Sequence, residues 1–106
     1  NWFTQEDLNQ ITLINSDDNC CSYFQDVTSL DELQYFNNLE IIKLFSFTNC
    51  IKLKSVIFPE NIKKIYYRSF YRCSSLKEII IPERFKDNMK NIFYNVDLSK
   101  VDITYI

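Results

Sequence analysis

The chain has 106 residues, 46% of them hydrophobic and 25% charged, and its twelve Lys and Arg are interspersed with fourteen Asp and Glu. This length and composition predict one ordered globular domain, and the formal net charge of −2 disfavours a nucleic-acid partner. Gly and His are both absent, which removes Gly-rich phosphate loops, the commonest general base and the commonest metal ligand, so we expect neither an enzyme nor a bound cofactor.

Residues 1–22 do not share the repeating pattern of the rest and are predicted to be an N-terminal cap segment. Thr4 is a suitable helix N-cap, acidic residues follow it, and apolar residues recur at helical spacing from Leu8 to Ile14. We expect a short amphipathic helix over about residues 4–14, followed by a polar turn. Such a helix would cover the exposed end of a stack of repeats.

Two motifs at the end of this segment offer metal ligands. Asp17-Asp18-Asn19 supplies oxygens, but a calcium loop also needs a central Gly and a Glu at its twelfth position, where this chain has Ser22 and Thr28. Cys20-Cys21 can form a strained disulfide or bind a soft metal, although we expect one cysteine to pack at the junction with the repeats and the other to be partly exposed. Zinc would need all four cysteines of the chain, from distant positions. We therefore expect no metal site.

A period of 23 residues organises the chain over residues 23–106, in about three and a half copies. The copies open on Phe24, Phe47, Phe70 and Phe93. Two further apolar columns follow, namely Val27, Cys50, Cys73 and Val96, and then Leu30, Leu53, Leu76 and Leu98. Self-similarity at this period predicts a solenoid whose units bury their apolar faces against one another. Because Val shares their column, we expect Cys50 and Cys73 to be buried free thiols, with a disulfide or ligand pair as the alternative.

Each copy holds two short extended pieces. The first is the β-branched run from Leu53 to Phe58, repeated from Leu76 to Ile81, and a proline ends each run. The second piece recurs at the same 23-residue interval, from Leu39 to Ile42 and from Ile62 to Ile65. Its apolar residues predict a short strand or extended turn. In the third copy this piece runs from Phe85 to Met89, where the second apolar residue is displaced by one position. No window of the repeats predicts a long helix.

The run Phe70-Tyr-Arg-Cys-Ser-Ser-Leu-Lys-Glu-Ile-Ile-Ile-Pro82, with Ile62 and Ile65 before it, resembles the BspA-like leucine-rich repeats of surface and secreted proteins in Bacteroides-type bacteria and some protists. The resemblance covers about residues 24–103. It implies a right-handed leucine-rich-repeat solenoid of 23-residue units, with short parallel strands and extended turns. Repeats of this family usually carry a Gly and an Ala at the bend before the Phe. Here the bend reads Tyr66-Tyr67-Arg68-Ser69, so the tight turn must be made without Gly.

Strand alternation predicts which side chains point away from the core. If Val56 faces inward, Ser55 and Ile57 face outward. Ile57 would then lie beside Ile80 of the next copy. The candidate interaction face consists of the outward residues Ile41, Lys43, Ser55, Ile57, Glu78, Ile80, Lys100 and Asp102. The alternative is that β-branched propensity or a covering segment alone explains the isoleucines. Tyrosines, which are favoured at interfaces, stand near the bends at Tyr66, Tyr67, Tyr71 and Tyr94.

The resemblance implies a non-enzymatic protein-interaction or adhesion module of an exported or cell-surface protein, with a host, matrix or self protein as its partner. The alternative is a structural spacer or assembly unit of a larger surface protein, with no ligand of its own. No apolar run approaches the roughly 18 residues that span a bilayer, so no transmembrane segment is expected. Because the chain starts with Asn1 rather than Met, we expect a mature or trimmed product without its signal.

Overall fold

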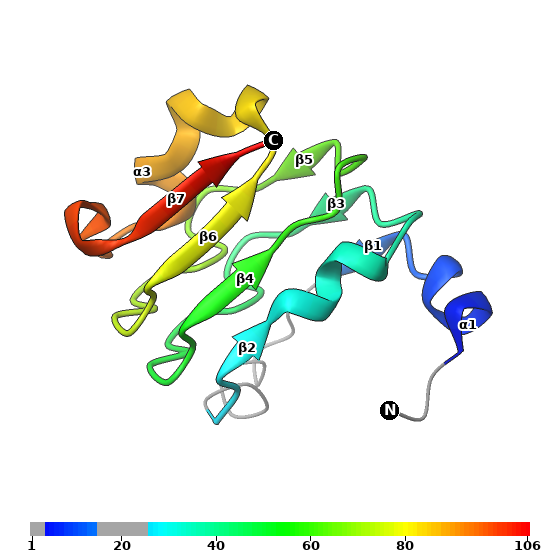
Figure 1. The fold of residues 1–106 in the computed structure, drawn as a ribbon, viewed down its shortest axis with the longest axis horizontal. Coiled ribbons are helices and arrows are strands. Elements are labelled where there is room, and N and C mark those ends of the chain that lie inside the picture. The colour runs from blue at the N-terminus through cyan, green and yellow to red at the C-terminus, as the bar shows by residue number, and fades with distance from the viewer. Residues whose placement is uncertain (1–3, 15–25) are drawn as a thin grey trace.

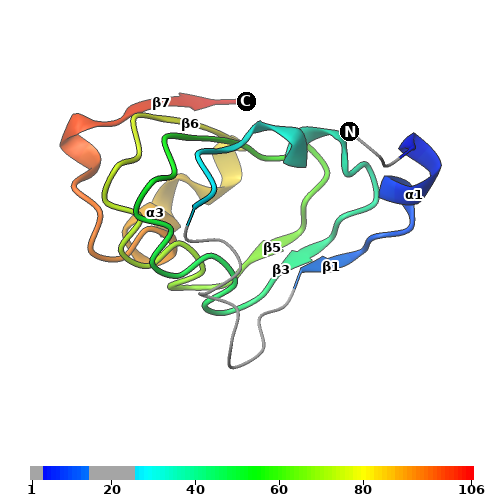
Figure 2. The ribbon, with the colours of Figure 1, turned by 90° about the horizontal axis from the view of Figure 1, so that it is seen from below.

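Two parallel β-sheets form the fold, and the chain passes back and forth between them (Figure 1). The computed structural model describes residues 4–14 and 26–106. The three-stranded sheet has the order β1-β3-β5 and consists of β1 (Leu13–Ile14), β3 (Ile41–Ile42) and β5 (Lys64–Ile65). The four-stranded sheet has the order β2-β4-β6-β7 and consists of β2 (Ser29–Leu30), β4 (Ser55–Ile57), β6 (Glu78–Ile81) and β7 (Asp102–Tyr105). Figure 2 shows the two sheets on opposite sides of the molecule.

The middle of the chain keeps the register that the repeat predicts. Ile41 of β3 lies beside Lys64 of β5, and Ser55 of β4 lies beside Glu78 of β6. Each pair is separated by the 23-residue period. The prediction of parallel strands is therefore confirmed, and in these two copies the second extended piece is also a short strand.

The register shifts in the first copy, where the predicted leucine column is wrong. Leu30 of β2 lies beside Val56 and not beside Leu53. A 3₁₀ helix, η1 (Asp31–Tyr35), follows β2 directly and buries Leu33. Because a helical turn advances less per residue than a strand does, this copy needs extra residues to return to the sheet.

The register also shifts in the last copy. Ile103 of β7 lies beside Ile79, a position that the repeat predicts for Val101. The expected column residue Leu98 lies in a 3₁₀ helix, η3 (Leu98–Lys100), and not in the sheet. This second helical turn explains why the leucine column ends after Leu76.

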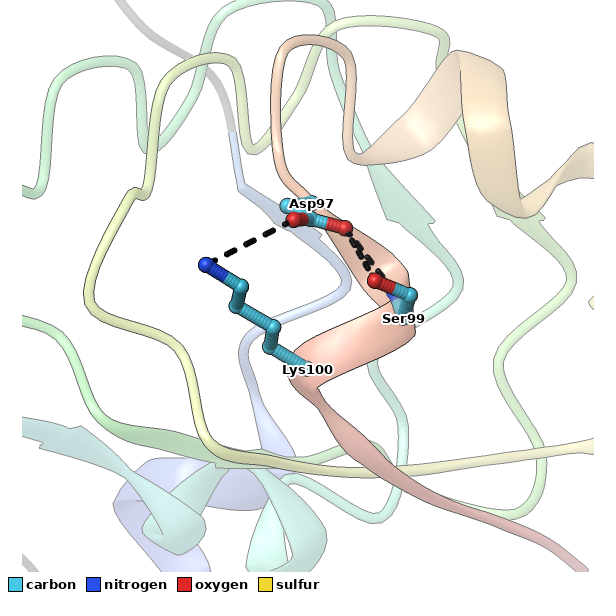
Figure 3. A network of polar contacts seen from close by, with 3 residues as sticks. All are labelled: Asp97, Ser99 and Lys100. Carbon is cyan, nitrogen blue, oxygen red and sulfur yellow. Dashed lines mark hydrogen bonds and ion pairs between the residues drawn. The ribbon is translucent and has the colours of Figure 1, made fainter.

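The start of η3 is held by a small polar network (Figure 3). The carboxylate of Asp97 accepts hydrogen bonds from the hydroxyl of Ser99, at 2.6 Å, and from its backbone N–H, at 3.2 Å. The ammonium of Lys100 lies 3.9 Å from the other carboxylate oxygen. These hydrogen bonds from Ser99, with a smaller contribution from the charge of Lys100, hold the pKa of Asp97 below its ordinary value.

The predicted N-terminal helix is present but shorter than residues 4–14. The helix α1 (Gln5–Asn9) begins after Thr4, whose hydroxyl accepts a hydrogen bond from the Asp7 N–H at 3.1 Å. The Asp7 carboxylate accepts one from the Thr4 N–H at 3.0 Å, which completes a capping box and lowers the pKa of Asp7. Beyond the helix the chain becomes extended and enters β1, where parallel pairing with β3 replaces the hydrogen bonds that a longer helix would have made.

The third copy departs from the prediction of an extended second piece. In the position of a further strand the chain forms a 3₁₀ helix, η2 (Glu83–Asn88), and one turn of α-helix, α3 (Met89–Ile92). Phe85, Met89 and Ile92 are all buried. Their spacing of four and then three residues places them on one face of a helix, whereas the earlier copies have a spacing of three.

The phenylalanine column forms the centre of the core, as predicted. Phe47, Phe70 and Phe93 are at most 3% exposed. The ring centroids of Phe47 and Phe70 are 5.0 Å apart, and those of Phe70 and Phe93 are 5.1 Å apart. Phe24 lies outside the described residues.

The two cysteines of the second column are also buried, whereas Val27 and Val96 at its ends are partly exposed. Cys50 and Cys73 are free thiols with no exposed surface, and the Cys73 thiol donates a hydrogen bond to the carbonyl of Phe47 at 3.2 Å. Hydrogen bonding with Cys50 and burial raise the pKa of the Cys73 thiol well above its ordinary value. The free-thiol prediction is therefore confirmed for this pair, whereas Cys20-Cys21 and Asp17-Asp18-Asn19 lie outside the described residues.

The bends are made without Gly by residues in the left-handed backbone region. Their φ angles are 60° at Phe45, 61° at Asn49, 59° at Arg68, 62° at Arg72 and 64° at Asn95. Phe45 and Arg68 are one period apart, and so are Asn49, Arg72 and Asn95. A Cβ makes this conformation cost about 1–2 kcal/mol per residue. Hydrogen bonds between copies offset that cost, such as that from the Arg72 N–H to the Tyr94 carbonyl at 3.0 Å.

Candidate functional site

The outer face of the four-stranded sheet holds the central part of the predicted interaction face. Ser55 and Ile57 of β4 lie directly beside Glu78 and Ile80 of β6. Glu78 is exposed and the other three are partly exposed, whereas Val56 between them is fully buried. The alternation expected from the sequence therefore describes these two strands correctly.

The predicted face changes composition at β7. Asp102 lies beside Glu78, and the residue beside Ile80 is Thr104. Asp102 thus extends the row of Ser55 and Glu78, not the row of isoleucines. Lys100 lies in η3, before the strand begins, and its ammonium is directed toward Asp97 (Figure 3).

Two of the predicted residues lie on the opposite side of the molecule. Ile41 is in β3 and Lys43 is the first residue after that strand, where its N–H donates to the Ile14 carbonyl of β1 at 2.8 Å, so both lie at the three-stranded sheet. The structure therefore does not bring them together with Ile57 and Ile80. The period of 23 residues aligns pieces of the same type, but it does not say which sheet each piece joins.

A shallow hollow lies at the end of the outer face. Its volume is about 400 Å³, and its apolar lining includes Ile57, Ile80 and Pro59 together with Ile106, which is 49% exposed. We refer to Ile57, Ile80 and Ile106 as the isoleucine strip. Ile106 was not among the predicted residues. It joins the strip because its N–H donates to the Ile81 carbonyl at 3.0 Å, which continues the pairing of β7 with β6.

A second, larger hollow of about 710 Å³ lies where the chain turns from the four-stranded to the three-stranded sheet. Most of its lining residues carry a side-chain amide, namely Asn9, Gln10, Asn37, Asn38 and Asn61. An ion pair between Lys63 and Glu40, at 2.6 Å, lies at its edge. Asn37 and Asn61 line both hollows, so the polar hollow adjoins the isoleucine strip.

A third surface feature is a group of Arg and Tyr side chains. Only its tyrosines were singled out from the sequence. At the bend after β5 the guanidinium of Arg68 lies 4.5 Å from the ring centroid of Tyr94, and that of Arg72 lies 5.0 Å from the ring centroid of Tyr71. The centroids of Tyr71 and Tyr94 are 5.7 Å apart. The signal that would have revealed it is the period itself, because Tyr71 and Tyr94 are 23 residues apart.

Among residues 4–14 and 26–106, no three Cys, Asp or Glu side chains gather as metal ligands would. None of the described helices has the length and apolar character needed to cross a bilayer.

Comparison with protein families identifies the repeats. The model of the BspA type leucine-rich repeat region matches residues 1–105, in six copies. Comparisons with curated proteins and with solved structures gave no match. Repeats of this family are in general interaction modules of surface or secreted proteins and are typically non-enzymatic. The parallel strands, the stacked phenylalanine column and the family match lead to one conclusion: the chain belongs to the BspA-type leucine-rich repeat family.

Proposed function

We propose that this protein is a non-enzymatic interaction or adhesion module of an exported or cell-surface protein, and that it binds a protein partner through the outer face of the four-stranded sheet. The observation that carries the proposal is the pairing of Ile57 with Ile80 on that face. Both are partly exposed, and they continue into the exposed Ile106. No described helix or strand lies outside this sheet (Figure 2). Apolar side chains that gather on an open surface are typical of binding faces.

We further propose that the repeats form a right-handed solenoid of about three and a half copies over residues 23–106, with residues 1–22 as its N-terminal cap. The contacts of α1 support the cap. The Gln5 side chain donates to the Tyr35 carbonyl at 2.6 Å, and the Asn38 side chain donates to the Asn9 carbonyl at 2.7 Å. These bonds attach the helix to the first copy.

Polar residues beside the strip suit a protein partner. Glu78 and Asp102 flank the isoleucines and make no ion pair among the described residues. The adjoining amide-lined hollow supplies donors and acceptors at the edge. An apolar centre with a polar rim is the usual composition of a protein–protein interface.

The alternative function is that of a structural spacer or assembly unit with no ligand of its own. It is favoured by the position of β7, which has a strand on one side only within the described sheet. An open edge of this kind can pair with a further strand. The two functions differ in whether the isoleucine strip contributes to binding.

The test replaces Ile57 and Ile80 by Asp in one variant. The matched control replaces Leu13, which is 43% exposed on the other sheet, and Ile51, which is 52% exposed at a bend, also by Asp. Binding of both variants and of wild type to a panel of purified extracellular-matrix and cell-surface proteins is measured by biolayer interferometry, and their thermal melting is compared.

If the strip is the binding face, the Ile57→Asp/Ile80→Asp variant loses roughly tenfold or more in affinity for any protein that wild type binds, because buried carboxylates without partners oppose association. The control variant keeps wild-type affinity. Equal binding by both variants, with melting unchanged, would show that the strip is not the binding face, and absence of binding by wild type to every protein of the panel would favour the spacer function. Turnover in a screen of hydrolase substrates would contradict the non-enzymatic proposal.

A further inference from the structure

A cluster of Arg and Tyr side chains covers the outer surface of the bend that follows β5. We call it the Arg–Tyr cluster, and it consists of Tyr67, Arg68, Tyr71, Arg72 and Tyr94. Tyr67 and Tyr94 are 57% and 41% exposed, so the rings face solvent and are not part of the core. The cluster lies away from the isoleucine strip, which is on the four-stranded sheet.

Aromatic rings fix the position of the Arg68 side chain. Its guanidinium lies 4.5 Å from the ring centroid of Tyr94 and 6.0 Å from that of Tyr71. Among the described residues, no carboxylate pairs with Arg68. A guanidinium stacked on a ring keeps the N–H groups at its edge available, and these form two parallel hydrogen bonds with a carboxylate.

The backbone beneath the cluster adopts a costly conformation. Arg68 and Arg72 have φ angles of 59° and 62°, in the left-handed region that Gly normally occupies. The Arg68 N–H donates to the Asn91 carbonyl at 2.6 Å, so this geometry is held by the next copy. The same geometry positions both arginine side chains on one surface.

A groove runs from this cluster toward β5. One hollow of about 300 Å³ is lined by Lys64, Ile65, Tyr66, Tyr67, Asn88, Asn91 and Ile92. A second, of about 290 Å³, is lined by Tyr67, Arg68, Asn91 and Tyr94. The two hollows share Tyr67 and Asn91 and therefore adjoin. No Asp or Glu lines either of them.

We propose that this groove binds an extended acidic segment of a protein partner. Its carboxylates pair with Arg68 at one end and with Lys64 at the other, where the Lys64 ammonium lies 4.6 Å from the ring centroid of Tyr66. The segment between them packs on the ring of Tyr67 and forms hydrogen bonds with the Asn91 amide.

The composition of the groove supports an acidic peptide. Both charged residues that line it are cations, in a chain whose formal net charge is −2, so the complementarity is local. Arg and Tyr are enriched among the residues that dominate protein–protein binding energy. A nucleic acid would need a longer row of cations to neutralise its phosphates. This site is distinct from the isoleucine strip and does not depend on the function proposed for the strip.

The test uses a fluorescein-labelled peptide of alternating Glu and Ser, with a peptide of alternating Gln and Ser as its neutral counterpart. Fluorescence anisotropy measures their binding to wild type and to a Lys64→Gln/Arg68→Gln variant. We expect wild type to prefer the Glu peptide, and we expect the variant to bind it roughly tenfold more weakly. The preference should decrease as salt is added.

A matched control removes the same charge elsewhere. Lys54 and Lys77 are exposed and stand just before β4 and β6, so Lys54→Gln/Lys77→Gln should leave peptide affinity within about twofold of wild type. A Tyr67→Ser variant keeps the charge and removes an exposed ring. It should weaken binding severalfold, and it serves as the test if the arginine variant fails to fold.

Equal losses in the groove variant and the lysine control would overturn the proposal, because attraction would then depend on net charge alone. Tighter binding of a single-stranded oligonucleotide or a sulfated polysaccharide than of the Glu peptide would overturn it as well. The Ile57→Asp/Ile80→Asp variant should bind the peptide as wild type does, so a failure of one proposal can be told from a failure of the other.

Discussion

The rings of Phe47 and Phe70 lie 5.0 Å apart with their planes inclined by only 27°, although the two residues belong to successive copies of the repeat. Phe70 makes a similar contact with Phe93 on its other side, at 5.1 Å. The central ring therefore joins three copies. Loss of that ring removes packing from two interfaces at once.

Phe70→Ala should lower the free energy of unfolding by about 3–5 kcal/mol, because Phe70 has no exposed surface and a cavity would remain. Urea unfolding followed by circular dichroism measures the loss. Ile51→Ala is the control: its side chain is 52% exposed, and the change should be within about 0.5 kcal/mol. A Phe70→Ala variant as stable as this control would show that the column does not hold the copies together.

Arg72→Gly should be more stable than Arg72→Ala by about 0.5–1 kcal/mol. Ala keeps the Cβ that opposes a φ of 62°. Gly has no Cβ, and its only disadvantage is the larger conformational entropy that the unfolded chain loses on folding. Both variants lose the contact with Tyr71, so that loss cancels in the comparison. At Lys54, which does not have a positive φ, the Gly variant should be less stable than the Ala variant. Equal ranking at both positions would contradict the backbone argument.

Ser69→Ala should stabilise the protein by about 1 kcal/mol, because the Ser69 hydroxyl is fully buried and finds no partner among the described residues. Ser46 stands one period earlier and provides the matched control. Its hydroxyl donates to the Lys43 carbonyl at 2.7 Å, so Ser46→Ala should destabilise by a similar amount. Thermal melting of the two variants and of wild type tests whether Ser69→Ala stabilises and Ser46→Ala destabilises the protein. A Ser46→Ala variant more stable than wild type would contradict the hydrogen-bond argument.

The thiols of Cys50 and Cys73 should resist alkylation in the native state. Both are fully buried, and the pKa of Cys73 is raised by its hydrogen bonding with Cys50 and by burial, which disfavours the reactive thiolate. Reaction with iodoacetamide should be roughly a hundredfold slower than in urea, because it requires an opening of the fold. Peptide mapping separates these sites from Cys20 and Cys21. Under non-reducing conditions, linked Cys50 and Cys73 peptides with a mass lower by two hydrogens would indicate a disulfide and contradict the free-thiol state.

Asp97 should make stability depend on pH in the acidic range. Hydrogen bonds from Ser99 lower the pKa of its carboxyl in the folded state below 3.8, so the charged form stabilises the fold above that value. The stabilisation is lost as pH falls through the folded-state pKa. Asp97→Ala should therefore be less stable than wild type near neutral pH, and the difference should shrink below pH 3.8. Urea midpoints across this range measure it, and a difference that stays constant with pH would rule out this role.

The sequence alone determined the period, the parallel strands of the middle copies and the burial of the repeated phenylalanines and of Cys50 and Cys73. These follow from local chemistry: a β-branched run that ends at a proline forms a strand, and apolar residues at a fixed interval must be buried together. The pairing of Ile57 with Ile80 was predictable for the same reason, because the two copies that hold them have equal length. The N-cap position of Thr4 was also predictable because it is local, whereas the returning hydrogen bond from the Thr4 N–H to the Asp7 carboxylate was not predicted.

Only the tertiary structure decided the register of the end copies and the grouping of surface residues. Leu30 and Leu98 left their expected column because helical turns inserted beside the strands change how many residues one copy needs. Ile41 and Lys43 lie on the other sheet because a period does not assign pieces to sheets. The Arg–Tyr cluster depends on both a left-handed backbone at Arg68 and the next copy beside it. Neither can be read from one copy, since the contact of Arg68 with Tyr94 exists only when the copies stack.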